Sequence, residues 1–182
     1  MPRPPFGAIA AGMTAVLLLA AARPAPAQET DTTGADAAQP GPEHIGSFVH
    51  VRQEGASLLV APDTASSLNE GARLFLRCRA GQREVFVALT GEEGGLGNAR
   101  EGAAGQFRID RGPWTDLEQW GANESGTAAF MAPERIPTFV GRAAGGELAE
   151  VRIVNPAGVR TRFVFPLEGM EEALGRLPCM NG

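Results

Sequence analysis

The chain contains no lysine, and this absence limits the partners that its surface can attract. Its 182 residues carry 16 basic side chains, all of them arginine, against 21 acidic ones, which gives a net charge of −5. Nucleic-acid binding needs clustered lysine and arginine to neutralise phosphates, and an anionic membrane surface attracts the same cations. The acidic balance therefore predicts a protein that binds neither nucleic acid nor an anionic membrane surface.

Cysteine and histidine are also scarce, with two residues of each. Because zinc sites of the common Cys/His type take several such ligands at short spacings, we expect no metal, and nothing in the sequence indicates a cofactor. A Ser-His-Asp triad would have to use His44 or His50, near the start of the folded part. The chain has no Gly-x-Ser-x-Gly elbow that would expose a serine, so we expect no enzymatic activity of this type.

The first 27 residues have the pattern of an export signal. Arg3 supplies positive charge, residues 8–22 form an apolar run, and Ala25-Pro26-Ala27 is a small-x-small cleavage site. The alternative is a membrane anchor, but a helix over this run would span about 22 Å of a hydrocarbon core of about 30 Å. We therefore expect a signal peptide at 1–27 and a periplasmic or secreted mature chain without a membrane span.

Residues 28–43 hold four acids and no base among Thr, Ala, Gly, Pro and Gln. Such a composition does not bury enough apolar area to offset the entropy lost on ordering. We predict a disordered acidic leader at 28–43, followed by a single β-rich domain at 44–182.

Short runs with alternating apolar and polar residues recur from residue 48 onward, separated by Gly, Pro and Asn. This period of two is typical of strands. The expected strands lie at 48–52, 58–60, 73–79, 84–89, 107–110, 127–131, 148–154 and 160–165. The short connection Ala80-Gly81-Gln82 predicts a hairpin. About eight strands with short turns predict a mainly β fold, either an antiparallel sandwich or a partly open barrel.

Two segments have helical character, and one is rich in glycine. Residues 134–144 are expected to form a helical turn or more, limited by Pro137. Residues 169–177 place apolar side chains at helical spacing, with acids near the start and Arg176 near the end, which predicts a short C-terminal helix. Residues 91–105 contain six glycines and are expected to form a mobile loop.

Cys78 lies on an expected strand, and Cys179 follows the expected C-terminal helix. In an exported chain the simplest interpretation is one disulfide. It would close a loop of about 100 residues, for which the loop-entropy model gives about 4.7 kcal/mol. The alternative, a thioredoxin-type redox pair, needs near neighbours such as Cys-x-x-Cys. We therefore predict a structural disulfide that fastens the C-terminal helix to the sheet.

Arginines at alternating strand positions are the most unusual feature of the folded part. Six belong to this group: Arg73, Arg77, Arg79, Arg152, Arg160 and Arg162. They are interpreted either as an ordinary solvated face or as stripes that pair with carboxylates or receive an anionic ligand. Two tryptophans flank Asp116 and are either core caps or a contact patch. The candidate interaction surface is Arg77, Arg152, Arg162, Asp110, Trp114 and Trp120.

Several carboxylates lie close together in sequence, namely Asp110, Asp116, Glu118 and Glu124. A pair of carboxylates can serve glycoside hydrolysis, but Arg108 and Arg111 lie beside these, so solvated or paired carboxylates are favoured. A cell-wall-acting hydrolase that uses Asp110 with Asp116 or Glu118 is the alternative function. A third function is binding of a small anionic ligand by the arginines.

The order of several short segments resembles the VasI/TagO family. The segments are Leu74–Cys78, Val85–Val87, Phe107–Asp110, Trp120, Thr127–Phe130, Val151–Ile153, Phe163, and Gly169–Leu174 before Cys179. That family consists of exported accessory proteins associated with bacterial type VI secretion. The resemblance implies a non-enzymatic accessory protein that contacts an envelope protein partner. A weaker similarity, to the invasion-associated locus B family, rests on the Gly-x-x-x-Ala helix and the cysteine-bearing strands.

Overall fold

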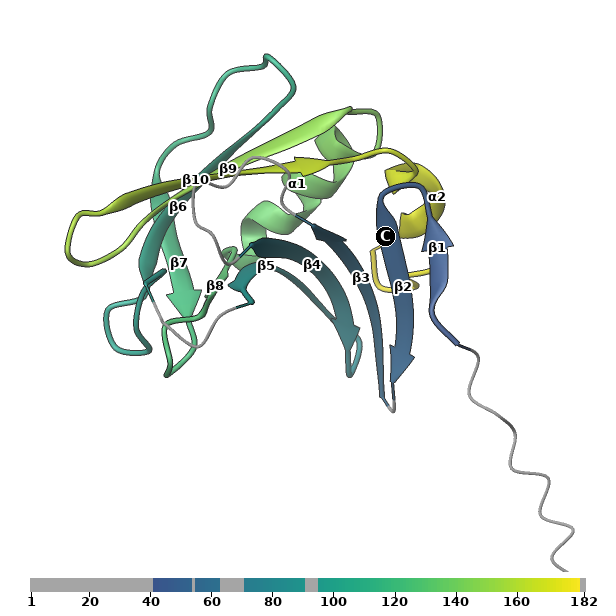
Figure 1. Ribbon diagram of the computed structural model, residues 1–182, viewed down its shortest axis with the longest axis horizontal. Helices are drawn as coiled ribbons and strands as arrows, with labels where there is room; N and C mark the ends of the chain where they lie inside the picture. Colours follow the sequence, from purple (N-terminus) through teal and green to yellow (C-terminus); the bar gives the residue numbers. More distant parts are fainter. Residues whose placement is uncertain (1–40, 54, 63–70, 91–94, 181–182) are drawn as a thin grey trace, which may run out of the picture. The chain divides into compact units, whose positions relative to one another are not determined.

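The computed structural model describes residues 41–53, 55–62, 71–90 and 95–180 (Figure 1). These residues belong to one compact unit, Ala38–Gly182. The predicted signal peptide and residues 28–40 of the predicted leader lie outside the described residues. Glu43, the last residue of that predicted leader, is already part of the first strand.

The described strands form one antiparallel sheet in the order β1-β2-β3-β4-β5-β8-β7-β6-β9-β10. The strands are β1 Glu43–Ile45, β2 Phe48–Gln53, β3 Ala56–Pro62, β4 Ala72–Arg79, β5 Gln82–Leu89, β6 Ala103–Ile109, β7 Glu118–Ala122, β8 Ala128–Phe130, β9 Leu148–Val154 and β10 Arg160–Pro166. The helices are η1 Pro133–Arg135, α1 Ile136–Ala143 and α2 Met170–Leu174. Because β1 and β10 end the sheet without pairing to each other, the sheet is not closed. The predicted mainly β class is confirmed.

The sheet folds over so that β10 lies across β3 and β4 (Figure 1). Phe163 and Phe165 of β10 and Leu59 of β3 are fully buried in the core between the two halves. Helix α1 contacts β5 and β6, one strand from each half. Its Phe139 packs edge-on against Phe107 of β6, with the ring centroids 5.1 Å apart. The core therefore lies between the two halves of a sandwich-like sheet.

The β4–β5 hairpin follows the predicted alternation. Leu74, Leu76 and Cys78 are buried, whereas the residues between them point to the outer face. Ala80 and Gly81 connect the strands with φ of +49° and +78°, as a two-residue turn of the I′ kind requires. The predicted hairpin is confirmed.

The alternation missed β1 and two further strand segments. The prediction of a mobile loop at 91–105 is wrong at its end, because 103–105 form the start of β6. Strand β7 was not predicted either, since its sequence, EQWGA, shows little alternation. These segments pair with each other, Ala103 opposite Trp120 and Gly105 opposite Glu118. Pairing and burial, rather than local propensity, determine these strands.

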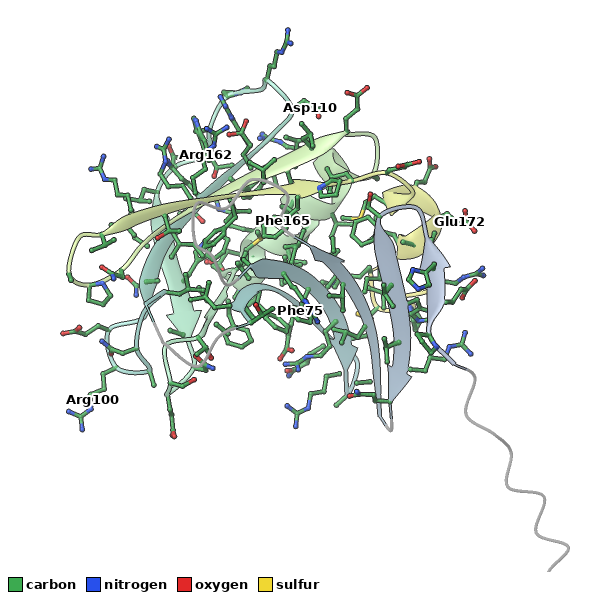
Figure 2. All side chains as sticks on the ribbon, in the orientation of Figure 1. Phe75, Arg100, Asp110, Arg162, Phe165 and Glu172 are labelled. Carbon is green, nitrogen blue, oxygen red and sulfur yellow. A yellow bond between two sulfur atoms is a disulfide. The ribbon has the colours of Figure 1, made fainter. Side chains whose placement is uncertain are left out.

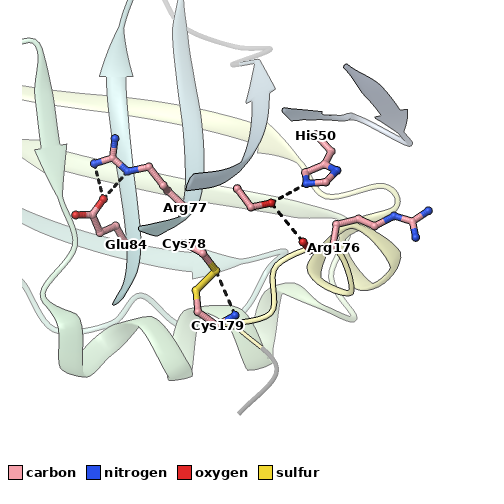
Figure 3. Close-up of a disulfide and its surroundings, with 7 residues drawn as sticks. His50, Arg77, Cys78, Glu84, Arg176 and Cys179 are labelled. Atoms are coloured by element: carbon pink, nitrogen blue, oxygen red, sulfur yellow. Dashed lines mark hydrogen bonds and ion pairs between the residues drawn. A yellow bond between two sulfur atoms is a disulfide. The ribbon is translucent and has the colours of Figure 1, made fainter. Parts of the chain in front are cut away.

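The predicted disulfide joins Cys78 of β4 to Cys179, with the two Cα atoms 5.8 Å apart (Figure 3). The Cys179 amide also donates to Cys78 Sγ at 3.3 Å. Helix α2 lies inside the predicted range 169–177 and is shorter than it. The turn before β2 holds the start of α2, because the Ser47 amide donates to the carbonyl of Glu168 at 2.9 Å. The C-terminal segment is thus attached to the sheet at both ends, and the disulfide is compatible with an oxidising compartment.

Candidate binding surfaces

Three arginines gather on the outer face of the half formed by β6, β9 and β10. Arg108, Arg152 and Arg162 come from these three strands in turn, and Figure 2 shows Arg162 on the outer side of this half. Arg152 is directly opposite Arg162 in the β9–β10 register. Together with Trp114 and Glu150, described next, they form what we call the arginine–tryptophan surface.

Glu150 of β9 lies between two of these arginines and is only 7% exposed. Its Oε1 accepts a hydrogen bond from Arg108 at 2.6 Å, and its Oε2 lies 2.5 Å from the Arg162 guanidinium. A buried carboxylate is stable only when it is paired, and here Arg108 hydrogen-bonds Oε1 while Arg162 forms an ion pair with Oε2. Glu150 therefore holds Arg108 and Arg162 in place.

Trp114 covers part of this face, although it lies in the segment between β6 and β7. Thr115 brings the segment back to the sheet, because its amide donates to the Phe107 carbonyl at 2.9 Å and its Oγ1 accepts from the Phe107 amide at 3.0 Å. The guanidinium carbons of Arg152 and Arg108 lie 4.4 Å and 4.9 Å from the centroid of the Trp114 ring. Such cation–π contacts orient both guanidinium groups.

Three phenylalanines form a row on the outer face of the other half of the sheet. Phe75 of β4 is opposite Phe86 of β5, which is opposite Phe130 of β8. Their ring centroids are 4.7 Å and 4.8 Å apart in this order. Phe75 and Phe130 are half-buried, and Figure 2 shows Phe75 on the outer side of β4. We call these three residues the aromatic row.

Arg77 lies over the middle ring of the aromatic row. Its guanidinium carbon is 5.0 Å from the Phe86 ring centroid, and its Nε donates to Glu84 Oε2 at 2.5 Å (Figure 3). The pair lies across the β4–β5 hairpin, with Arg77 directly opposite Glu84. Arg77 is therefore part of the aromatic row's border and not of the arginine–tryptophan surface.

A groove of about 1010 Å³ runs beside Phe130. It is lined by Gly81–Val85, Gln119, Gly121, Phe130–Glu134, Ile136 and Pro137. The groove exists because β8 pairs only with residues 86–88 of β5 and then turns away into η1, leaving residues 82–85 without β8 beside them. Gly121 is opposite Phe130 and has no side chain, which keeps this end of the groove open.

Two other residues of the predicted interaction surface, Trp120 and Asp110, have structural roles. Trp120 is 2% exposed and packs against Gly105, so its prediction as a contact residue is wrong. Asp110 is exposed, but its Oδ1 accepts the amides of Glu147 and Leu148, each at 2.9 Å. It therefore orders the turn before β9 and lies at the edge of the arginine-bearing half.

Asp110 and Glu118, named in the alternative hydrolase hypothesis, make separate contacts. Asp110 is occupied by backbone amides, whereas Glu118 of β7 accepts a hydrogen bond from Arg135 Nε at 2.7 Å. The hydrogen bond and charge of Glu118 raise the pKa of the Arg135 guanidinium. Glu118 thus ties η1 to β7.

His50 lies between Glu43 and Ser57, and the three residues form a polar row that sequence spacing did not reveal. It is 3% exposed, its Nε2 lies 2.8 Å from Ser57 Oγ, and its Nδ1 lies 3.5 Å from Glu43 Oε2. The β1–β2–β3 register brings these residues together. Ser57 Oγ also donates to the Arg176 carbonyl at 3.4 Å (Figure 3). This contact ties the C-terminal segment to β3 and, through His50, to β2.

The described residues contain no group of three or more His, Cys, Asp or Glu side chains that could hold a metal ion. In the same part of the chain, no helix combines the length and the apolar character needed to cross a bilayer. Comparison of the whole chain with family models, curated proteins and solved structures finds no match.

Proposed function

We propose that this protein is a non-enzymatic binding module of the bacterial cell envelope, which acts by contacting a protein partner through the outer faces of its sheet. The observation that carries the proposal is the aromatic row, with its adjoining groove, on the outer side of the sheet. Phe75 and Phe130 are half-buried there rather than enclosed in the core.

Side-chain chemistry supports a protein partner. Apolar patches bordered by polar groups are typical of interaction sites, and aromatic residues and arginine are enriched where proteins bind one another. The aromatic row has such a border in the paired Arg77 and Glu84. The rings already pack on each other, so a partner would meet a surface with few side-chain rotamers left to fix.

The location in the envelope rests on two supports. Residues 1–27 have the pattern of an export signal, and the Cys78–Cys179 disulfide suits an oxidising compartment. The resemblance to the VasI/TagO family extends the proposal to an accessory role in type VI secretion. On that reading the partner is an envelope protein of the secretion apparatus.

Blocking the groove tests the proposal. Gly121 is exposed, and a Cβ there would meet nothing closer than Phe130 Cβ at 3.7 Å, so Gly121→Val adds a branched side chain at this end of the groove. Gly141→Ala is the matched control, because an added Cβ there meets nothing within 4 Å. We expect the tagged parent and Gly141→Ala to retain the same envelope protein from membrane and periplasmic extracts, and Gly121→Val to lose it. Equal recovery of the envelope protein with the parent and both variants would contradict the proposal that the aromatic row and its groove bind the partner.

A second assay separates binding from catalysis. Purified protein is incubated with peptidoglycan, and released fragments are measured for the parent and for Asp110→Asn. We expect no turnover, because Asp110 is occupied by two backbone amides. Turnover that disappears in Asp110→Asn would favour a cell-wall hydrolase and contradict a pure binding module.

A further inference from the structure

We infer that the arginine–tryptophan surface binds an acidic segment of the protein partner, with a partner carboxylate held by Arg152. This inference rests on the proposed function, because it names the chemistry of one contact with that partner. It concerns a different half of the sheet from the aromatic row.

The charge on this surface is not balanced. Among the residues that the structure describes, Glu150 is the carboxylate that pairs with this surface, and it binds Arg108 and Arg162. Within the described residues Arg152 has no acidic partner, and its contact is with the Trp114 ring. The surface therefore holds an ordered guanidinium group that is free to bind a carboxylate. This local positive charge stands out in a chain whose net charge is −5.

The strand register provides a second and independent observation. Arg152 is directly opposite Arg162, and like charges at directly opposed positions of an antiparallel pair are unfavourable. Glu150 reaches Arg162 but no ion pair joins it to Arg152 in the described part of the chain. A carboxylate placed beside Arg152 would remove this repulsion, and the planar guanidinium can bind it with two hydrogen bonds.

The shape of the site indicates a protein segment rather than a small free anion. The groove beside Phe130 is lined by residues of β5, β7, β8, η1 and α1, whereas Arg152 stands on an outer strand face of β9. Small ligands favour concave sites, and tryptophan and arginine on open faces are typical centres of protein interfaces. Leu148, on the same outer side of β9 as Glu150 and Arg152, is 42% exposed and offers an apolar contact next to the charges.

A defined peptide tests this inference without the natural partner. The probe is a hexaglutamate peptide, with hexaglutamine as the neutral comparison, titrated into the purified full chain and followed by calorimetry and tryptophan fluorescence. The variant is Arg152→Gln. Arg100→Gln is the control of equal charge, because Arg100 is exposed in the segment before β6, away from this surface (Figure 2).

We expect saturable binding of hexaglutamate at low salt and loss of binding at about 0.5 M salt, where charges are screened within a few ångströms. Arg152→Gln should weaken binding by about tenfold, whereas Arg100→Gln should change it less than about twofold. Absence of saturable binding, or equal weakening by both variants, would overturn the inference.

Two further experiments distinguish other possible occupants of the arginine–tryptophan surface. Inorganic phosphate that binds as tightly as the peptide, with the same dependence on Arg152, would assign the site to small anions and overturn the inference. The other possible occupant is the protein's own acidic leader, which is tested by neutralising Glu29, Asp31 and Asp36 in the full chain. A large gain in peptide affinity would show that the leader occupies the surface, and this result would also overturn the inference. Capture of an envelope protein that depends on Gly121 but not on Arg152 would refute this inference alone and leave the proposed function standing.

Discussion

Gly105 of β6 lies directly against the indole of Trp120 on β7. A Cβ on Gly105 would fall 2.3 Å from two carbons of that ring, which is well inside van der Waals contact. Trp120 is 2% exposed, so the absence of a side chain at Gly105 is what allows the largest side chain of β7 to enter the core. This contact joins two strand segments that the sequence pattern did not predict, β7 and the start of β6.

Replacement of Gly105 by alanine should therefore destabilise the protein by about 1–3 kcal/mol, the usual cost of overpacking a filled core. Urea unfolding followed by tryptophan fluorescence measures the change. Gly121→Ala on the neighbouring strand is the control, since its added Cβ meets nothing closer than 3.7 Å. Equal stability of the two variants would show that Trp120 moves aside without cost.

Removal of the disulfide should loosen the C-terminal segment. Replacement of both Cys78 and Cys179 by alanine, or reduction of the parent protein, should lower the free energy of unfolding by about 2–5 kcal/mol, because the link restrains a loop of 101 residues in the unfolded chain. Calorimetric melting with and without a reducing agent gives the comparison. An unchanged melting temperature after confirmed reduction would contradict this role.

Ser57 should contribute to stability through His50. Ser57→Ala leaves the imidazole Nε2 buried without its partner, which costs about 1–3 kcal/mol. The double variant Ser57→Ala with His50→Leu should recover part of this loss, because both polar partners are then absent. A double-mutant cycle by urea unfolding measures the coupling, and strictly additive losses would argue against the hydrogen bond.

Glu43 should make stability depend on pH in the acid range. Desolvation alone would raise the pKa of Glu43, but the hydrogen bond and charge of Arg176, together with His50, outweigh it and lower that pKa. A carboxyl with a depressed pKa stabilises the fold above its unfolded pKa, here near 4.5, and loses this contribution as the pH falls through the folded pKa. Glu43→Gln should therefore be less stable than the parent at pH 7 and equally stable near pH 2. A stability difference between the parent and Glu43→Gln that stays constant from pH 7 to pH 2 would contradict a lowered pKa of Glu43.

The regular part of the fold follows from local sequence. Residues 148–154 alternate clearly and form β9 with the predicted bounds, and the Ala80-Gly81 turn defines the β4–β5 hairpin. The pattern does not predict β7 or the start of β6, because glycine and small residues there give little alternation. Those strands form through their pairing with each other and through the burial of Trp120, which are properties of the whole fold.

The candidate surfaces were only partly predictable. Alternation placed Arg77, Arg152 and Arg162 on outer faces, as the structure has them, but it did not reveal that Arg77 lies on the other half of the sheet. Phe86 stands within five consecutive apolar residues, 85–89, so its face is ambiguous from sequence. The aromatic row becomes visible only through the register that sets Phe86 opposite Phe75 and Phe130.

Photo-cross-linking in the native compartment tests the central claim most directly. Benzoylphenylalanine at Phe75 keeps an aromatic ring in the aromatic row, and the same group at Thr138, an exposed residue of α1, serves as the reference position. The account predicts a discrete cross-link to one envelope protein from position 75 and none to that protein from position 138. No cross-link from position 75, or the same products from both positions, would contradict a binding module that uses this face.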